Sequence, residues 1–387
     1  MPDTFLEAHK VGPLQFAISA PLTPISIRDQ MVRAKMFVDR AVGEALIGPA
    51  RPLFVVGAGA GGVAAAVYAA RQGVPTSVIE ILGDPFGLQS KCFSRLVNPT
   101  QYDWPADHWS HAIFPWRNPV MPLPWAAARA NRIAAAWKNI FNNTQRHFPL
   151  TVHYFSQLTS RTFSAPRQDL EIIFEKDFGT PATRFITQRF GAALFAVGFG
   201  QERSSIGPYK AFDFWETEDF ENPRLGVPPY TPARPVRVLI CGGGDGALQD
   251  FLRITTGEAS AADILQKLLP YMPGDWSGIY SSEDQGHRAN LWNSSAEEDH
   301  VVMTQLEDVH RIHIHQLLSG APGSTLLKAV VALLAPAGHL QVALVHTCTH
   351  FSRSYALNRF LVRLIEECAL QAGLAISVQS GAGVNSV

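Results

Sequence analysis

Two glycine-rich turns, each preceded by an apolar run, constrain the fold of this chain more than any other feature. The first, GAGAGG at residues 57–62, follows the apolar run 53–56, and the second, CGGGDGA at residues 241–247, ends the run that begins at 236. An apolar run, a glycine turn and a segment with helical periodicity are typical of a strand, a tight turn and a helix. The chain is therefore predicted to be an α/β protein with two strand–turn–helix units.

The first turn satisfies the pattern G-x-G-x-x-G through Gly57, Gly59 and Gly62. In that pattern the first glycine permits a tight turn, the second lets the backbone approach a pyrophosphate, and the third allows close packing of helix on strand. The following helix start offers free N–H groups and the positive end of its dipole to phosphates. Glu80 ends the next predicted strand, 76–80, near the usual spacing of about 20 residues for a ribose-binding acid. The pattern predicts a dinucleotide site; the alternative is a packing turn without a ligand.

Three segments together resemble the flavoproteins built from two dinucleotide-binding domains, a group that includes thioredoxin reductases, ferredoxin–NADP reductases and flavin-containing monooxygenases. GAGAGGVAAAVYAARQGVPTSVIE at 57–80 resembles their FAD-binding opening. AALFAVG at 192–198 is similar to their apolar strand that ends in A-T-G, and the turn at 241–247 to their G-G-G-D-S-A turn for NAD(P)H. The resemblance covers about residues 50–290. It implies two Rossmann-like three-layer units and a small antiparallel β-sheet.

The same resemblance implies a domain division and a set of cofactor-binding residues. Residues 1–49 are expected to form an N-terminal helical extension, 50–205 the FAD-binding domain, 206–350 the NAD(P)-binding domain, and 351–387 a C-terminal segment packing on the FAD domain. The residues assigned to FAD are Gly57, Ala58, Gly59, Gly61, Gly62 and Glu80. Those assigned to the nicotinamide cofactor are Gly242, Gly244, Asp245, Ala247 and Glu283. No catalytic residue and no metal ligand is assigned.

The choice between NADH and NADPH depends on the segment GIYSSEDQGHRA at 278–289. NADPH-dependent relatives carry an arginine cluster at the corresponding place, whereas this chain has Glu283 and Asp284. A carboxylate accepts a hydrogen bond from a free 2′-hydroxyl and repels a 2′-phosphate. NADH is therefore expected over NADPH, the alternative being a solvated acidic turn.

Two departures from the resemblance restrict the reaction. The four cysteines form no C-x-x-C pair, which argues against a disulfide as electron acceptor and is typical of reduced thiols. The late Gly-Asp turn that closes the FAD site in the family is not found before Val387, so a homo-oligomer or a second subunit is a candidate to complete that site. The resemblance thus implies an oxidoreductase that passes electrons to oxygen or a small organic substrate.

Two other function classes remain open. The turn at 241–247 also resembles the nucleoside-binding loop of aminopropyltransferases and Rossmann-like methyltransferases, which need an acid after the following strand. A non-catalytic protein that binds or senses a dinucleotide would carry the same two turns.

Weaker candidates are histidines and cysteines outside the turns. His346, Cys348 and His350 would share one face of a strand, as would His313 and His315, and imidazole and thiolate groups hold zinc or iron. His108 and His111 are candidates for general acid–base catalysis beside a flavin, and Cys92 is a single thiol near the expected flavin. The structural alternatives are hydrogen-bonded histidines, loop caps and a buried small residue.

Composition excludes several function classes. The chain has 387 residues, 47% hydrophobic and 17% charged, with a net charge of −1. A compact protein is expected, because disorder needs low hydrophobicity and high net charge, and the lack of a basic excess disfavours nucleic-acid binding. The N-terminus has no apolar signal region, and the uncharged stretch 53–70 contains glycines and a strand–helix pattern that argue against a membrane span. A cytoplasmic enzyme with a small-molecule substrate is expected.

Overall fold

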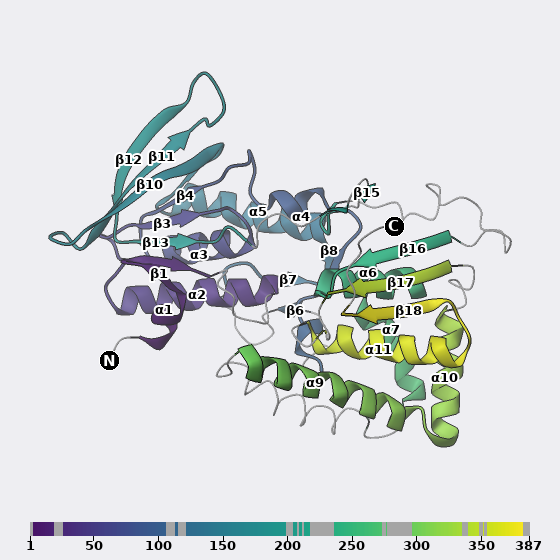
Figure 1. Ribbon diagram of the computed structural model, residues 1–387. Helices are drawn as coiled ribbons and strands as arrows, with labels where there is room; N and C mark the ends of the chain where they lie inside the picture. The colour runs from purple at the N-terminus through teal and green to yellow at the C-terminus, as the bar shows by residue number, and fades with distance from the viewer. Residues whose placement is uncertain are drawn as a thin grey trace. The chain divides into compact units, whose positions relative to one another are not determined.

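The computed structural model describes residues 3–18, 26–105, 113–114, 121–198, 204–206, 209–210, 213–216, 236–272, 276, 296–334, 340–347, 351 and 354–381. The chain forms two compact units. Unit 1 comprises Met1–Pro99, Ile113–Arg203 and Trp215–Thr217, and unit 2 comprises Thr100–Ala112, Ser204–Phe214 and Glu218–Val387. Each unit combines a largely parallel sheet with helices (Figure 1), which confirms the predicted α/β class.

The main sheet of unit 1 has the strand order β1-β2-β13-β3-β4-β9. These strands are β1 (Lys10–Gly12), β2 (Gln15–Ala17), β13 (Ala192–Phe195), β3 (Leu53–Val56), β4 (Thr76–Ile79) and β9 (Leu150–His153). An antiparallel sheet contains β10 (Ser156–Ser164), β11 (Asp169–Lys176) and β12 (Arg184–Phe190). Two short pairs join β5 (Leu96–Val97) to β8 (Ala128–Arg129) and β6 (Ile113–Phe114) to β7 (Trp125–Ala126). The helices are α1 (Thr4–His9), α2 (Ile27–Gly43), α3 (Ala60–Arg71), α4 (Gly87–Lys91) and α5 (Ala130–His147).

Strand β3 shows why unit 1 is built in three layers. It is apolar on both faces, as expected for a strand that is covered on both sides. Leu53 and Val55 belong to the core formed with the helices, whereas the Phe54 ring lies 5.8 Å from that of Phe174 and 4.8 Å from that of Phe190. Figure 1 shows α2 and α3 on one side of the main sheet and β10–β12 on the other.

The carboxyl ends of the parallel strands meet at one edge of the main sheet. Strands β13, β3, β4 and β9 are paired in parallel and in register. Gly57 follows β3, Glu80 follows β4 and Ala196 follows β13. This edge therefore brings the first glycine turn and the acid predicted from the sequence to one place.

Residues 1–49 are not a separate helical extension, which corrects the expectation from the sequence. Strand β2 pairs in parallel with β13, with Gln15 opposite Ala193, so this segment supplies strands to the main sheet. Helix α2 starts after Ser26, whose hydroxyl accepts a hydrogen bond from Asp29 N, and its apolar side joins the core of unit 1. The hairpin β1–β2 was missed because strands of three residues leave almost no alternation to detect.

The parallel sheet of unit 2 has the order β16-β17-β18, with β16 (Val236–Cys241), β17 (Leu340–His346) and β18 (Ile376–Ser380). The long helices are α6 (Asp245–Thr256), α7 (Ala261–Leu268), α9 (Ala296–Leu317), α10 (Gly320–Leu334) and α11 (Ala356–Gln371). Short elements are the 3₁₀ turns η1 (Gln101–Asp103) and η4 (Leu269–Tyr271) and the pair β14 (Ser205–Ile206) and β15 (Tyr209–Lys210). The second glycine turn joins β16 to α6, as predicted.

The described residues of the segment 351–387 are part of unit 2, which corrects the expectation that this segment belongs with the FAD-binding domain. Strand β18 pairs in parallel with β17, with Ile376 opposite Val342. Helix α11 adds Leu357 and Phe360 to the core of this unit, and it buries the polar side chain of Arg359 as well. A helix that is buried around most of its surface has no single apolar stripe. The sequence of α11 therefore does not indicate which domain the helix packs against.

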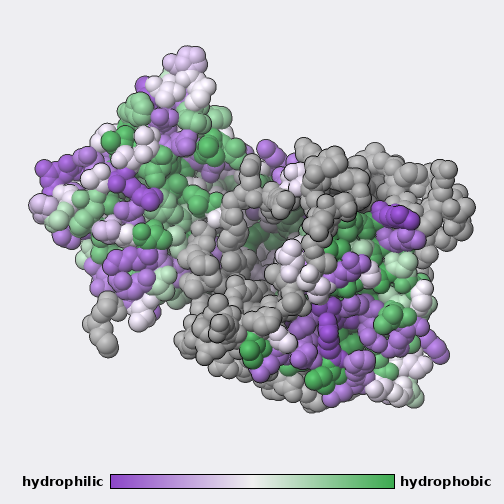
Figure 2. All heavy atoms as spheres, viewed as in Figure 1, coloured by the Kyte–Doolittle hydropathy of each residue, from purple (hydrophilic) through white to green (hydrophobic). Residues whose placement is uncertain are grey.

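The visible surface mixes polar and apolar residues. Figure 2 shows hydrophilic and hydrophobic side chains interspersed over both units. Within the described part of the chain, no single helix has the length and apolar character needed to cross a membrane. One pair of helical segments, Glu307–Leu317 and Gly320–Leu334, meets that test only when the two are counted together across a 105° bend.

The substitution Gly62→Ala tests the close packing of α3 on β3. A Cβ at position 62 would collide with the carbonyl oxygen of Gly57, so we expect the free energy of unfolding to fall by about 1–3 kcal/mol, as for other overpacked sites. The matched control is Gly43→Ala at the end of α2, where a Cβ would meet no atom within 4 Å. The control should be neutral or stabilising, because alanine is the better helix former. Denaturant titration measures both, and equal stability of the two variants would contradict this account.

Candidate functional site

Two positions in the first glycine turn, 57 and 62, have room only for glycine. Gly57 has φ +99°, and a Cβ there would lie 2.6 Å from the carbonyl oxygen of Ala196. Gly57 N donates to Ile79 O at 2.9 Å, which ties the turn to β4. Position 62 has no room for a Cβ beside the Gly57 carbonyl. These two glycines are explained by packing alone, as their places in the motif predict.

Gly59 differs from these two because the space around it is open. It is the N-cap of α3, no side chain caps it, and a Cβ built on it meets no atom within 4 Å. The first N–H groups of a helix have no acceptor within the helix and carry the positive end of its dipole. An anion can therefore approach the start of α3 past Gly59. At Gly61, by contrast, a Cβ would lie 2.8 Å from Ile18 Cδ1, so this glycine serves packing.

Glu80 reaches back to the first turn. One carboxylate oxygen, Oε2, accepts a hydrogen bond from Ala58 N at 2.6 Å, and the other, Oε1, accepts one from Leu82 N at 2.9 Å. Its own N–H donates to His153 O at 2.9 Å. The sequence predicted this acid at the turn, and the structure places it there. Since a carboxylate can accept about four hydrogen bonds, Glu80 retains acceptor capacity for hydroxyl groups of a ligand.

Two side chains at the carboxyl end of β9, His153 in its last position and Tyr154 directly after it, are partly buried near Glu80. Burial raises the pKa of Tyr154 to about 12, and the negative charges of Asp84 and Glu80 add to this rise. Burial also lowers the pKa of His153, an effect that the charge of Lys176 reinforces. At neutral pH both groups are therefore uncharged.

The second turn repeats the arrangement of the first. Gly242 has φ +133°, and its N–H donates to Val345 O at 2.9 Å. Gly244 is the N-cap of α6, with no capping side chain and no atom within 4 Å of a built Cβ. Ala247 packs against the turn, because its Cβ lies 3.3 Å from the place of a Cβ on Gly242. Gly244 is thus the counterpart of Gly59.

Asp245 has a role that sequence reasoning missed. Its Oδ1 accepts hydrogen bonds from Tyr355 N at 2.8 Å and from Asn358 Nδ2 at 2.9 Å. The residue predicted to contact the nicotinamide cofactor therefore joins the start of α6 to the start of α11. The sequence shows Asp245 only as an acid in the first turn of a predicted helix. The partners of its carboxylate lie more than a hundred residues further along the chain, so no local pattern indicates them.

Several predicted residues lie outside the described residues, namely His108, His111, Glu283, Asp284, Cys348 and His350. Cys92 is fully buried in the core of unit 1, with its Sγ 3.9 Å from Ser94 Oγ. His313 and His315 lie on helix α9 and not on a strand, so alternation does not bring them to one face. In the described part of the chain no group of three His, Cys, Asp or Glu side chains is arranged to hold a metal ion.

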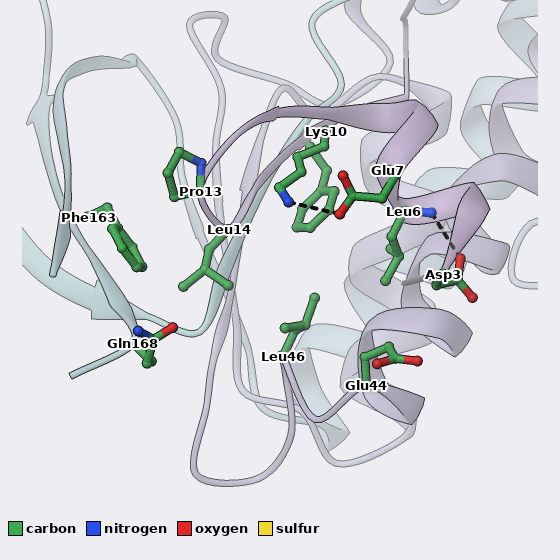
Figure 3. A pocket seen from close by; sticks show the side chains of 11 residues that line it. Asp3, Leu6, Glu7, Lys10, Pro13, Leu14, Glu44, Leu46, Phe163 and Gln168 are labelled. Atoms are coloured by element: carbon green, nitrogen blue, oxygen red, sulfur yellow. Dashed lines mark hydrogen bonds and ion pairs between the residues drawn. The ribbon is translucent and has the colours of Figure 1, made fainter. Parts of the chain in front are cut away.

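A pocket of about 300 Å³ lies in unit 1, at some distance along the strands from the glycine turn. Figure 3 shows Leu14, Leu46 and Phe163 on its wall and the ion pair between Glu7 and Lys10 at its rim. Leu14 precedes β2 and Leu46 precedes β3, so the pocket lies toward the amino ends of these strands. Because the glycine turn follows the carboxyl end of β3, the pocket is not part of that turn.

Comparison with known family models matches one segment of the chain. Residues 55–122, which contain the first glycine turn and Glu80, match the family model of the NAD(P)-binding Rossmann-like domain. No curated protein sequence matches the chain.

Solved structures of several oxidoreductases match parts of this chain at low identity and low TM-score. Bacillithiol disulfide reductase from Bacillus cereus is 11% identical, with a TM-score of 0.41, over 87% of this chain and 69% of that chain. Thioredoxin reductase from Lactococcus lactis is 15% identical, with a TM-score of 0.30, over 53% of this chain and 52% of that chain. Cyclohexanone monooxygenase from a Rhodococcus species is 14% identical, with a TM-score of 0.31, over 53% of this chain and 36% of that chain.

The substitution Glu80→Gln tests how the first turn is held. The glutamine amide has one oxygen, so either Ala58 N or Leu82 N loses its acceptor. We expect at least one of these two amide hydrogens to exchange about tenfold faster, because an unpaired amide costs about 1–3 kcal/mol. The control is Asp84→Asn, which removes the ion pair with Lys138 and leaves both amides bonded. Hydrogen exchange measured by NMR checks this, and unchanged exchange at both amides in Glu80→Gln would refute it.

Acid should weaken unit 1 through His153. Its Nε2 is buried and has no partner among the described residues, and burial lowers its pKa below the ordinary value of 6.5. A group with a lowered pKa contributes stability above its ordinary pKa, and this contribution is lost as the pH falls through the lowered value. Thermal unfolding between about pH 7 and pH 5 should therefore show a smaller loss of stability in His153→Gln than in the wild type. The exposed His147 gives the control His147→Gln, and identical pH profiles for all three proteins would rule out this role.

Proposed function

We propose that the protein is an FAD-dependent oxidoreductase that takes hydride from NADH and passes electrons to oxygen or to a small organic substrate. The repeated geometry of the two glycine turns carries this proposal. In each unit a parallel strand ends in a glycine turn that opens a helix, and the N-cap glycine, Gly59 or Gly244, faces open space. Two phosphate-binding helix starts provide for two dinucleotides, which hydride transfer from one cofactor to another requires.

Unit 1 suits FAD through the surroundings of Glu80 as well as through Gly59. Ile81, Leu82 and Phe155 are 54%, 43% and 53% exposed, and Phe155 N donates to Leu82 O at 3.3 Å. Large apolar side chains in one exposed group are typical of binding surfaces. Phe155 also has φ +49°, a strained conformation for a bulky residue that occurs preferentially at functional sites. A phosphate site, a ribose acceptor and an apolar surface thus follow one another along the edge of the sheet.

Unit 2 suits the nicotinamide cofactor because its turn has the same open N-cap in the position that the two-domain flavoproteins use for NAD(P)H. The start of α6 at Gly244 would hold the pyrophosphate, and Gly242 would allow the turn. Asp245 would act by holding the turn, since its carboxylate is bonded to α11. The preference for NADH rests on Glu283 and Asp284.

When bound, FAD supplies the redox chemistry, and the residues of the chain bind and orient it. The start of α3 would neutralise the pyrophosphate, and Glu80 would accept hydrogen bonds from the ribose hydroxyls. The acceptor is proposed to be oxygen or a small organic molecule, because the cysteine spacing provides no redox pair. A second copy of the chain or another subunit remains a proposed partner that completes the FAD site.

The visible spectrum of the purified protein tests the proposal directly. We expect the yellow absorbance of a bound flavin, bleached by NADH without oxygen and bleached more slowly by NADPH. A colourless protein that does not take up added FAD would contradict the proposal and would favour the transferase or the dinucleotide-sensing alternative. A flavin that is reduced equally well or faster by NADPH would contradict only the choice of NADH.

Two matched substitutions assign the two sites. Gly59→Val places a side chain where the pyrophosphate would approach α3, so the protein should lose FAD. Gly244→Val should retain FAD but lose its bleaching by NADH. Gly48→Val is the control, because a Cβ there also meets no atom within 4 Å and Gly48 precedes β3, whereas the first turn follows it. Loss of FAD in Gly244→Val but not in Gly59→Val would reverse the assignment.

A further inference from the structure

The second glycine turn is held from outside by the residues that lead into α11. Ser354 Oγ donates to Gly243 O at 3.0 Å. Asp245 Oδ1 accepts from Tyr355 N and from Asn358 Nδ2. The turn therefore depends on a segment that follows it by more than a hundred residues. We call this segment the α11 entry segment and define it as Phe351, Ser354, Tyr355 and Asn358.

The α11 entry segment is in turn braced by Glu307 of α9. Glu307 Oε2 accepts a hydrogen bond from Phe351 N at 3.2 Å, and Oε1 accepts one from Arg363 Nε. The Arg363 guanidinium carbon lies 4.4 Å from the centroid of the Phe351 ring. Glu307 is 5% exposed and Arg363 is 4% exposed. A buried carboxylate is costly unless it is paired and hydrogen-bonded, so these partners define its position.

Phe351 links this brace to the turn. Its ring centroid lies 4.4 Å from that of His346, the last residue of β17. The place of a Cβ on Gly243 is 3.4 Å from His346 Cβ. His346 Nε2 is also 3.0 Å from Ser380 Oγ at the end of β18, which fixes the imidazole between the two strands. A continuous path of contacts thus runs from Glu307 through Phe351 and His346 to Gly243.

We propose that Glu307 is a positioning residue for the second dinucleotide site. It holds the α11 entry segment, which holds the second glycine turn in the conformation that receives the pyrophosphate. Preorganised N–H groups bind an anion more tightly than groups that must be ordered on binding. Gly244 has no capping side chain of its own, so the turn takes its order from these outside contacts. The inference rests on the proposed function of this turn, and it predicts an effect on cofactor affinity rather than on flavin reduction itself.

Three variants of the FAD-loaded protein separate this role from a general loss of the ion pair. Glu307→Leu removes the acceptor of Phe351 N and the partner of Arg363, whereas Glu307→Gln keeps one acceptor. Glu366→Gln is the matched control, because Glu366 Oε2 accepts a hydrogen bond from Arg363 Nη1 at 2.6 Å, whereas among the described residues Phe351 N is bonded to Glu307 and not to Glu366. NAD⁺ is the probe, because it cannot reduce the flavin, and calorimetric titration measures its Kd.

The Kd of NAD⁺ should rise about tenfold in Glu307→Leu, about threefold in Glu307→Gln and less than twofold in Glu366→Gln, where tenfold corresponds to about 1.4 kcal/mol. The FAD content should stay unchanged, and the KM for NADH should rise without a change in the maximal rate of flavin reduction. If the wild type binds no NAD⁺, the proposed function fails. If the wild type binds and both Glu307 variants bind equally well, or if only the maximal rate changes, the positioning role is overturned. Should Glu307→Leu not fold, Glu307→Gln decides the question.

Discussion

The first glycine turn depends on one close approach between a helix and a strand. The Gly57 carbonyl occupies the space in which any side chain at position 62 would have to lie. Helix α3 therefore starts directly at the end of β3, and its N-cap, Gly59, faces open space. Glu80 closes the same turn from the next strand by binding Ala58 N. Packing thus creates the open helix start at which we propose that an anion binds, and Glu80 is held beside it by its hydrogen bond to Ala58 N.

The glycine turn of the second unit has a similar geometry, but different contacts hold it in place. Its turn contains Gly242 in a left-handed conformation and an open N-cap at Gly244, but among the described residues no acid that follows the adjacent strand β17 is bonded to it. Instead Asp245 and the Gly243 carbonyl are held by the start of α11, and α9 braces that segment through Glu307. The two turns therefore differ in the residues that hold them by hydrogen bonds. The first is held by Glu80, which follows the adjacent strand, and the second by residues more than a hundred positions further along the chain.

This difference also explains how much of the molecule could be predicted from the sequence. Strand β3, helix α3 and strand β4 are local, apolar and separated by glycines, so their positions and the place of Glu80 follow from short-range patterns. The pairing of β18 with β17 and the bond from Asn358 to Asp245 join residues that are distant in the chain. No periodicity encodes such contacts. The prediction that His313 and His315 share one face is wrong, because alternate residues share a face only on a strand. Both histidines lie on helix α9.

The central claim is that one chain holds two different dinucleotides, one at each glycine turn. Native mass spectrometry of the protein with FAD and NAD⁺ tests it most directly, because it counts the bound molecules of each kind. The account predicts one FAD and one NAD⁺ per chain at saturation. Saturation with a single dinucleotide per chain, or competition of FAD and NAD⁺ for one place, would contradict it.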